Sequence, residues 1–431
     1  MNNENMNMSI MNNNINFNPP MKIIKNYSSN YENSYANAVL QAFSSLDCIS
    51  NWIKKLNDIS NLLKNIQESI TKELYILFSN LYNGNQVDST NLISTLEKQV
   101  REIYKKVMKK DEYHFLKYFL IMLHLENNCP NNPEFDINSY NNKTIENIKN
   151  DNHMYNSFCN FFQQTTNSII SQYFYNIEKY FTSCSKCSQI FYYDHRIILT
   201  FDIDKFLSLR NKIYPNKNCS NISLKECFYY YQYLNDCQCP ICKDPMSKEK
   251  TTLFSSTKVL ILRFKRASHN LKCDIDFDFQ FNINDMDISN NNVEARRNNY
   301  YLKSIVSLYQ FRNCSKYFSD VYINDNWYRF CDIYDSAMNI NDDKCLKKYE
   351  PQMLIYELNE DNNHTNPFYN SLNQENTSIY LTILVNQPII TFKKNNIMDI
   401  IRFNSHLNEV QMKVKKKNNN FYNQNNLDNE N

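Results

Sequence analysis

Glycine occurs only once in this chain of 431 residues, at Gly84. Backbone that must pass close to a phosphate group needs glycine, because a Cβ atom would occupy the space of the ligand. The chain therefore carries neither a P-loop nor the glycine-rich dinucleotide fingerprint. Asparagine is abundant and tolerates left-handed backbone better than most residues, so we expect it to form many of the turns.

The charge balance points to no strongly charged partner. Lys and Arg total 47 and Asp and Glu total 45, which leaves a formal net charge of +2 and no direct signal for nucleic acid. The first ten residues, "MNNENMNMSI", lack the basic and apolar regions of a signal peptide, and no apolar run is long enough for a membrane span. We therefore predict an intracellular protein, nuclear or cytoplasmic, whose 14 cysteines stay reduced.

The order of hydrophobic patterns predicts an α+β fold. Residues 1–20 and 391–431 are Asn-rich, the latter also basic, and are predicted to be disordered tails around one domain at 21–390. Helical periodicity covers residues 34–63, 91–110 and 111–128, with Val107 among the inward positions of the second. Residues 339–378 are polar and are predicted to be an insertion between the last two strands. The strands are predicted from β-branched and aromatic runs at residues 189–203, 257–267, 300–311, 317–325, 326–334 and 378–387.

Two CxxC pairs form the clearest candidate metal site. Cys184 and Cys187 lie in "CSKC", and Cys239 and Cys242 lie in "CQCPIC". Two such pairs supply the four thiolates of a tetrahedral structural zinc site, which leaves no coordination position open for water. Cys237 is a spare thiol that could replace Cys239, and four free thiols without a metal are the alternative.

Five features in order resemble the ubiquitin-specific protease (USP) family, the papain-like peptidases also called ubiquitin carboxyl-terminal hydrolases. "ENSYANAVLQAF" is similar to the family's Asn-Thr-Cys-Tyr-Met-Asn-Ser-x-Leu-Gln-Ala-Leu, and "DEYHFLKYFLIMLH" to Asp-Ala-His/Gln-Glu-Phe-Leu with its following helix. The stretch from Tyr300 to Asp332 is similar to the final box, "LILRFKR" resembles the Leu-Lys-Arg-Phe strand, and the CxxC pairs stand where many members bind zinc. The resemblance implies a helical thumb at about 21–165, zinc-pinned β fingers at about 166–250 and a β palm at about 251–390.

The family's chemistry does not carry over to the matching positions. The nucleophilic Cys falls on Ser34, the general-base His on Lys316, the residue that orients this His on Cys331 with Asp332 beside it, and the oxyanion Asn on Ser29. A serine hydroxyl needs a strong adjacent base, and a lysine starts about four pKa units above a histidine. The resemblance therefore implies an inactive, degenerate member.

Two alternative roles for Ser34 follow from its chemistry. Ser34 and Lys316 could form a Ser–Lys dyad, because such pairs hydrolyse acyl bonds when the lysine is desolvated. Acidic neighbours such as Asp320 argue against a desolvated Lys316. Ser34 is otherwise explained as an ordinary helix N-cap.

Three functions remain open at the level of sequence. The first is a pseudo-deubiquitinase that binds ubiquitin, a ubiquitin-like protein or a protein complex; its first box is most similar to the USP-like splicing factors of the tri-snRNP, which implies a spliceosomal or other RNA-processing assembly. The second is an active hydrolase that uses Ser34 and Lys316. The third is a zinc-stabilised structural protein unrelated to ubiquitin.

Overall fold

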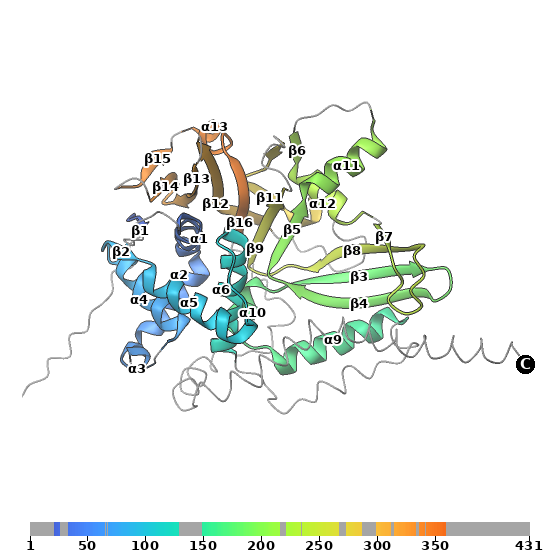
Figure 1. The fold of residues 1–431 in the computed structure, drawn as a ribbon, viewed down its shortest axis with the longest axis horizontal. Helices are drawn as coiled ribbons and strands as arrows, with labels where there is room; N and C mark the ends of the chain where they lie inside the picture. Colours follow the sequence, from blue (N-terminus) through green and yellow to red (C-terminus); the bar gives the residue numbers. More distant parts are fainter. Residues whose placement is uncertain are drawn as a thin grey trace, which may run out of the picture.

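The computed structural model describes residues 21–25, 33–64, 66, 68–128, 149–215, 221–233, 235–266, 273–286, 299–311, 314–332, 336–340 and 342–358. Figure 1 shows a group of helices, a central sheet and a long narrow sheet that extends to one side. The predicted tails and the predicted strand at 378–387 lie outside these residues. Among the described helices, none combines the length and apolar character that crossing a membrane requires.

The first part, the thumb, is built from helices. The predicted helix at 34–63 is three shorter helices, whereas the predicted helix at 111–128 is confirmed as α6. Two short strands, β1 (Ile24–Lys25) and β2 (Val87–Asp88), pair in parallel beside them. The helices are α1 (Ser34–Ser44), α2 (Asp47–Asn57), α3 (Ser60–Lys64), α4 (Ile70–Tyr82), α5 (Thr90–Tyr104), α6 (Glu112–Asn127), α9 (Asp151–Thr165) and α10 (Ile169–Phe174).

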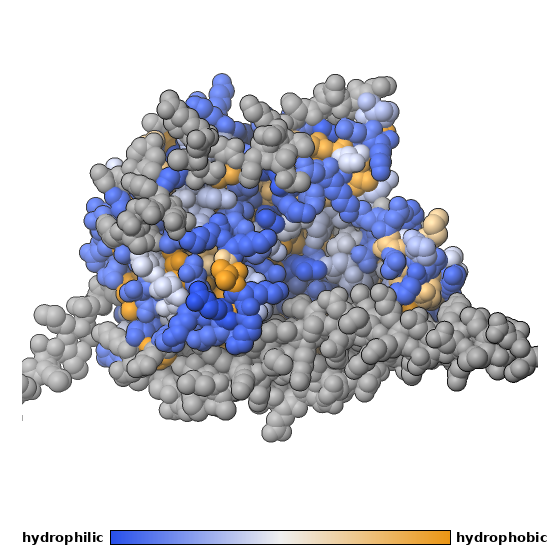
Figure 2. Space-filling view, viewed as in Figure 1, coloured by the Kyte–Doolittle hydropathy of each residue, from blue (hydrophilic) through white to orange (hydrophobic). Residues whose placement is uncertain are grey.

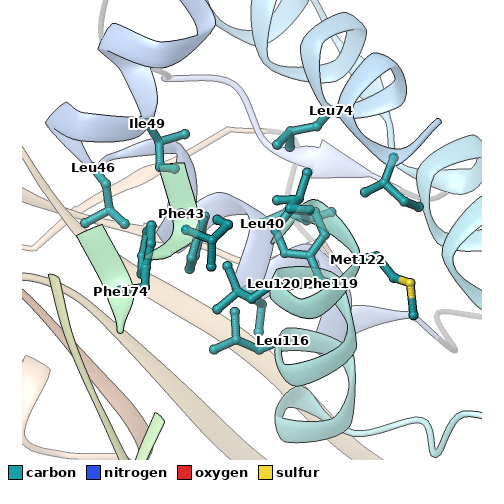
Figure 3. Close-up of a cluster of buried hydrophobic side chains, with 14 of the residues drawn as sticks. Leu40, Phe43, Leu46, Ile49, Leu74, Leu116, Phe119, Leu120, Met122 and Phe174 are labelled. Carbon is teal, nitrogen blue, oxygen red and sulfur yellow. The ribbon is translucent and has the colours of Figure 1, made fainter. Parts of the chain in front are cut away.

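Aromatic contacts hold the thumb helices together. Phe43 of α1 meets Phe119 of α6 edge-on, with ring centroids 5.9 Å apart, and stacks on Phe174 of α10 at 5.3 Å. Figure 3 shows these rings surrounded by leucine, isoleucine and methionine side chains of α2, α4 and α6. Such aromatic pairs add to the stability that burial itself provides.

The predicted helix at 91–110 is too long. Helix α5 ends at Tyr104, and Lys105 takes a left-handed conformation, with φ of 52°, as its C-cap. Val107 lies beyond this end and is 81% exposed, so its predicted inward position is wrong. The apolar residue fell on the helical period by chance, and left-handed C-caps end many helices.

The second part, the palm, is an eight-stranded sheet within the described residues. Its strand order is β15-β14-β13-β12-β16-β9-β5, and β11 pairs with one end of β12. All neighbouring strands are antiparallel except β5 and β9, which are parallel. The strands are β5 (Ile198–Asp202), β9 (Val259–Lys265), β11 (Gln280–Asn282), β12 (Asn299–Phe311), β13 (Cys314–Ile323), β14 (Asn326–Phe330), β15 (Met338–Ile340) and β16 (Glu350–Leu358).

The centre of the palm is buried on both faces. Ile261 of β9 and Ile355 of β16 pack into the thumb core, whereas their chain neighbours Leu262 and Leu354 pack into a second core on the opposite face. Strands covered on both sides read as continuous apolar runs. The prediction of a polar insertion at 339–378 is therefore wrong for residues 350–358, which form β16 in the middle of the sheet.

Short elements cover the second face of the palm and one of its edges. Helices α11 (Ile203–Ile213) and α12 (Leu224–Tyr231) pack there, with the 3-10 helix η1 (Ile283–Met286) and the paired strands β6 (Asn221–Ser223) and β10 (Asp274–Asp276). Helix α13 (Asp343–Leu346) precedes β16. Figure 2 shows that polar residues dominate the described surface in view, with apolar side chains only in small groups.

The third part, the fingers, is a four-stranded antiparallel sheet with the order β4-β3-β8-β7. Its strands are β3 (Asn176–Cys184), β4 (Ser188–Arg196), β7 (Asn235–Cys237) and β8 (Ser247–Ser255). The strand predicted at 189–203 is divided between β4 of the fingers and β5 of the palm. The α+β fold with helical thumb, β fingers and β palm is confirmed.

Candidate functional site

Ser34 lies where the thumb meets the palm. It is the first residue of α1 and is only 5% exposed. The N-cap of α1 is Asn33, whose side chain makes no capping hydrogen bond, so the interpretation of Ser34 as the N-cap is wrong. The Ser34 hydroxyl points instead to β13, where it accepts a hydrogen bond from the backbone N–H of Tyr317 at 3.4 Å.

Lys316 directly precedes Tyr317 in β13. Its positive charge acts electrostatically on the carboxyl of Asp332, which follows β14. Burial raises the pKa of the Asp332 carboxyl, while the positive charge of Lys316 and the nearby side chain of Asn37 of α1 oppose this shift. The structure therefore brings α1, β13 and the end of β14 together, as the sequence positions require.

Cys331 occupies the position from which the family's acidic residue orients its histidine. It is buried at the end of β14, directly before Asp332. A thiol lacks the carboxylate oxygens that fix an imidazole, and position 316 carries no imidazole. Ser29, at the oxyanion position, lies outside the described residues.

The carboxylate of Asp320 pairs with Arg329 and not with Lys316. Both of its carboxylate oxygens accept hydrogen bonds from Arg329 of β14, at 2.7 and 2.8 Å, and the pair is largely buried. Burial raises the pKa of Asp320 to about 6, although Arg329 opposes the shift. This forked ion pair joins β13 to β14 and is a structural contact.

The retained polar residues of the first box are also structural. Gln41 accepts a hydrogen bond from the backbone N–H of Ile24 at 3.1 Å, and Asn37 accepts one from the hydroxyl of Ser89 at 2.6 Å. Both side chains are buried. They fix α1 to β1 and to the start of α5, and so they position Ser34 whether or not it performs chemistry.

A histidine–carboxylate pair was missed by the sequence analysis. Asp111, the N-cap of α6, accepts a hydrogen bond from the backbone N–H of His114, and the Nδ1 atom of His114 lies 2.7 Å from both Asp111 oxygens. The only sequence signal was the i, i+3 spacing of the two residues. The hydrogen bond that the Ser34 hydroxyl accepts comes from Tyr317 of β13 and not from this pair.

The four predicted metal ligands come together at the tip of the fingers. The sulfur atoms of Cys184, Cys187, Cys239 and Cys242 all lie within 4.8 Å of one another, and those of Cys184 and Cys242 are 3.5 Å apart. A tetrahedral site with zinc–sulfur bonds of ~2.3 Å requires sulfur atoms about 3.8 Å apart, so the donor set and its spacing fit zinc. Cys237 lies on β7 and is not part of this cluster.

Asp244 supports both halves of the cluster and was not predicted. Its Oδ2 atom accepts a hydrogen bond from the Ser185 hydroxyl at 2.9 Å, within the first CxxC turn. Its backbone carbonyl accepts one from the N–H of Cys239 at 2.9 Å, within the second. Residues that orient metal ligands in this way are a usual part of metal sites.

Comparison with known proteins agrees with this geometry. The sequence model of the family described as ubiquitin carboxyl-terminal hydrolase matches residues 28–356. A search of curated proteins finds no match. Similar solved structures are below 25% identical to this chain in sequence, so they show the fold alone.

Three of the similar solved structures are SAGA deubiquitinating modules. One is the yeast module with an Sgf73 mutant, at 17% identity and a TM-score of 0.53, with 80% of this chain and 70% of that chain covered. The Ubp8/Sgf11/Sus1/Sgf73 module bound to ubiquitin aldehyde matches at 16% and 0.53, with 80% and 71% covered. The module bound to monoubiquitin matches at 16% and 0.51, with the same coverage.

Proposed function

Because this chain belongs to the ubiquitin carboxyl-terminal hydrolase family, we propose that it is a pseudo-deubiquitinase, a USP fold without peptidase chemistry that binds ubiquitin or another protein. The observation that carries the proposal is the hydrogen bond of Ser34. Its hydroxyl accepts from the Tyr317 backbone N–H, and among the described residues it donates to no base, although a nucleophilic serine must pass its proton to one. The replaced positions around it supply no imidazole in the place of the family's base.

The proposal includes a structural zinc ion at the fingertip. Cys184, Cys187, Cys239 and Cys242 would hold it, and with four thiolates the ion takes no part in hydrolysis. It would join the β3–β4 turn to the loop between β7 and β8. Without it, four sulfur atoms crowded together would have no charge to balance their thiolate forms.

A protein-binding role is supported by what the chain retains. The thumb, palm and fingers are all present, and the residues that position α1 keep their structural contacts. Two of the matched structures are described as bound to ubiquitin. A spliceosomal or other RNA-processing assembly stays a proposal that rests on the first box alone.

Titration of isotope-labelled ubiquitin with the purified chain tests the binding role. Saturable shifts of one set of ubiquitin resonances are expected, and an unrelated protein of similar size serves as the control. If ubiquitin shows no saturable shift at concentrations up to the millimolar range, ubiquitin recognition is wrong and the fold serves another partner.

The second candidate function is hydrolysis through Ser34. The observation that favours it is the proximity of Ser34, Lys316 and Asp332 at one junction, with the His114–Asp111 pair on the neighbouring helix. It predicts turnover of a ubiquitin substrate that disappears in Ser34→Ala. The absence of such turnover would leave the binding role alone.

A further inference from the structure

The loop that joins α5 to α6 concentrates positive charge at one place on the thumb. It spans residues 105–110, reads "KKVMKK" and is called the basic loop below. It holds four lysines and no acidic residue, whereas the whole chain has a formal net charge of only +2. A local excess of one sign attracts partners of the opposite sign. The basic loop is therefore a candidate contact for a negatively charged partner.

The charges of the basic loop face solvent. Lys105, Lys106 and Lys109 are exposed, and among the described residues none of the three takes part in an ion pair. The acidic residue that follows the loop, Asp111, points to the first turn of α6, where it accepts a hydrogen bond from the backbone N–H of His114 at 2.7 Å. The three lysines are thus available to a partner.

Three contacts fix the backbone of the basic loop. Lys105 ends α5 in a left-handed conformation, and its N–H donates to the carbonyl of Arg101 at 3.0 Å. Met108 is 5% exposed and packs into the thumb core. Asp111 caps the start of α6. A partner that binds such a preorganised loop orders little new backbone, which lowers the entropic cost of binding.

Val107 is an apolar side chain at the centre of this basic surface. It is 81% exposed, whereas Met108 beside it is buried. Lys106 precedes Val107 and Lys109 follows it, so exposed lysines stand on both sides. Protein interfaces commonly place an apolar centre within a polar rim, and covering an exposed aliphatic side chain stabilises a complex by hydrophobic burial. The basic loop offers a charged contact and an apolar contact together.

These features favour an acidic protein segment over nucleic acid or a membrane. Single-stranded nucleic acid stacks its bases on aromatic rings. The rings at the two ends of the loop are already engaged, because Tyr104 packs on Tyr118 with centroids 5.2 Å apart. The guanidinium group of Arg263 likewise lies over the ring of Tyr113, 3.9 Å from its centroid. Membrane-surface segments bury a whole apolar face, whereas this loop exposes a single valine.

We propose that the basic loop is a docking surface for an acidic segment of a partner protein. Carboxylates of the segment pair with Lys106 and Lys109, and one of its apolar side chains covers Val107. This inference goes beyond the proposed function, because the surface lies on the thumb and requires neither ubiquitin nor residue 34. Ubiquitin recognition and acidic-segment recognition therefore succeed or fail separately.

Fluorescence anisotropy of a labelled acidic peptide tests the surface. The probe is a short fluorescein-labelled peptide in which glutamates flank a Leu-Leu pair, and it is titrated with the full chain. Lys106→Gln combined with Lys109→Gln removes two charges, and Val107→Ser removes the apolar centre. Lys205→Gln combined with Lys212→Gln is the matched control, because it removes two charges at exposed positions of α11. Circular dichroism checks that each variant is folded.

The wild type should bind the peptide with an affinity that falls as the salt concentration rises. The variant without Lys106 and Lys109 should bind about tenfold more weakly, because each exposed ion pair contributes a factor of a few. Val107→Ser should also weaken binding, and the α11 control should bind like the wild type. Absence of binding by the wild type, or an equal loss in the α11 control, would overturn the proposal. Tighter binding of labelled oligouridine or of phosphatidylserine vesicles than of the peptide would overturn it as well, and would assign the loop to nucleic acid or to an anionic membrane.

Discussion

The fingertip and the thumb–palm junction differ in what they have retained. At the fingertip all four thiols stand at ligand spacing, and Asp244 holds both CxxC turns. At the junction the contacts that hold α1 are present. Positions 34, 316 and 331, where the resemblance implies the family's Cys, His and acidic residue, carry Ser, Lys and Cys. A metal site that holds two loops together is needed for folding, whereas a nucleophile and its base are needed only for turnover. This contrast is what the proposed pseudo-deubiquitinase role predicts.

The largest effect is expected from Cys239→Ser. Cys239 is fully buried in the thiol cluster, and losing a structural metal ligand should lower the free energy of unfolding by about 4 kcal/mol or more. Zinc content by mass spectrometry should fall from one ion per chain to none, with a lower melting temperature. Cys237→Ser is the matched control. Equal zinc loss in both variants would show that Cys237 is also a ligand. The assignment of the site to the four clustered cysteines would then be wrong.

A smaller, pH-dependent effect is expected from Asp320, which pairs with Arg329 within the palm. Its pKa of about 6 lies above the value of ~3.9 in an unfolded chain, so between these values the folded state holds more protons. The stability from this group is present below pH 4 and is lost as the pH rises through 6, by up to about 3 kcal/mol. Chemical denaturation at pH 4.5 and pH 7 should show this loss in the wild type relative to Asp320→Asn. Asp325→Asn, in the exposed β13–β14 turn, should not differ from the wild type; parallel pH curves for the wild type and Asp320→Asn would refute the prediction.

Gln41→Ala should destabilise the junction by about 2 kcal/mol. The substitution removes the buried acceptor of the Ile24 N–H and leaves that donor unpaired. Denaturation midpoints measure the change, and Gln189→Ala, at an exposed position of β4, is the control. A change below 0.5 kcal/mol would mean that the first box is not maintained by structural contacts.

Ser34→Ala should have the smallest effect, about 1 kcal/mol or less. The hydrogen bond from Tyr317 is long, and alanine is favourable within a helix. Measuring Ser34→Ala and Gln41→Ala in one denaturation series compares the stability contributed by residue 34 with that contributed by a residue that holds α1 in place. A loss as large as that of Gln41→Ala would give Ser34 a structural role that the present account does not contain.

The elements that sequence analysis found are those with a clear period or spacing. Helix α6 has a long apolar face, and the two CxxC pairs identify their ligands by spacing alone. Strand β16 was missed because both of its faces are buried, so it shows no alternation and stands alone among Asn-rich segments. The end of α5 was missed because a left-handed cap at Lys105 leaves no glycine signal.

The contacts within the junction could not be read from the sequence. Positions 34, 316 and 331 were located by resemblance, but the partner of each side chain depends on tertiary packing. Asp320 was taken as a neighbour of Lys316, yet it pairs with Arg329 nine residues away. Ser34 and Tyr317 are 283 positions apart, and neither carries a pattern that predicts their hydrogen bond.

Hydrolysis of a fluorogenic ubiquitin C-terminal reporter tests the central claim most directly. The purified wild type is compared with Ser34→Ala, Lys316→Ala and His114→Ala, with each protein shown to be folded. If the chain is a pseudo-deubiquitinase, wild type and variants alike give no turnover above the uncatalysed rate. Turnover by the wild type that disappears in Ser34→Ala would contradict the account and establish a serine hydrolase, with the Lys316 and His114 variants identifying its base.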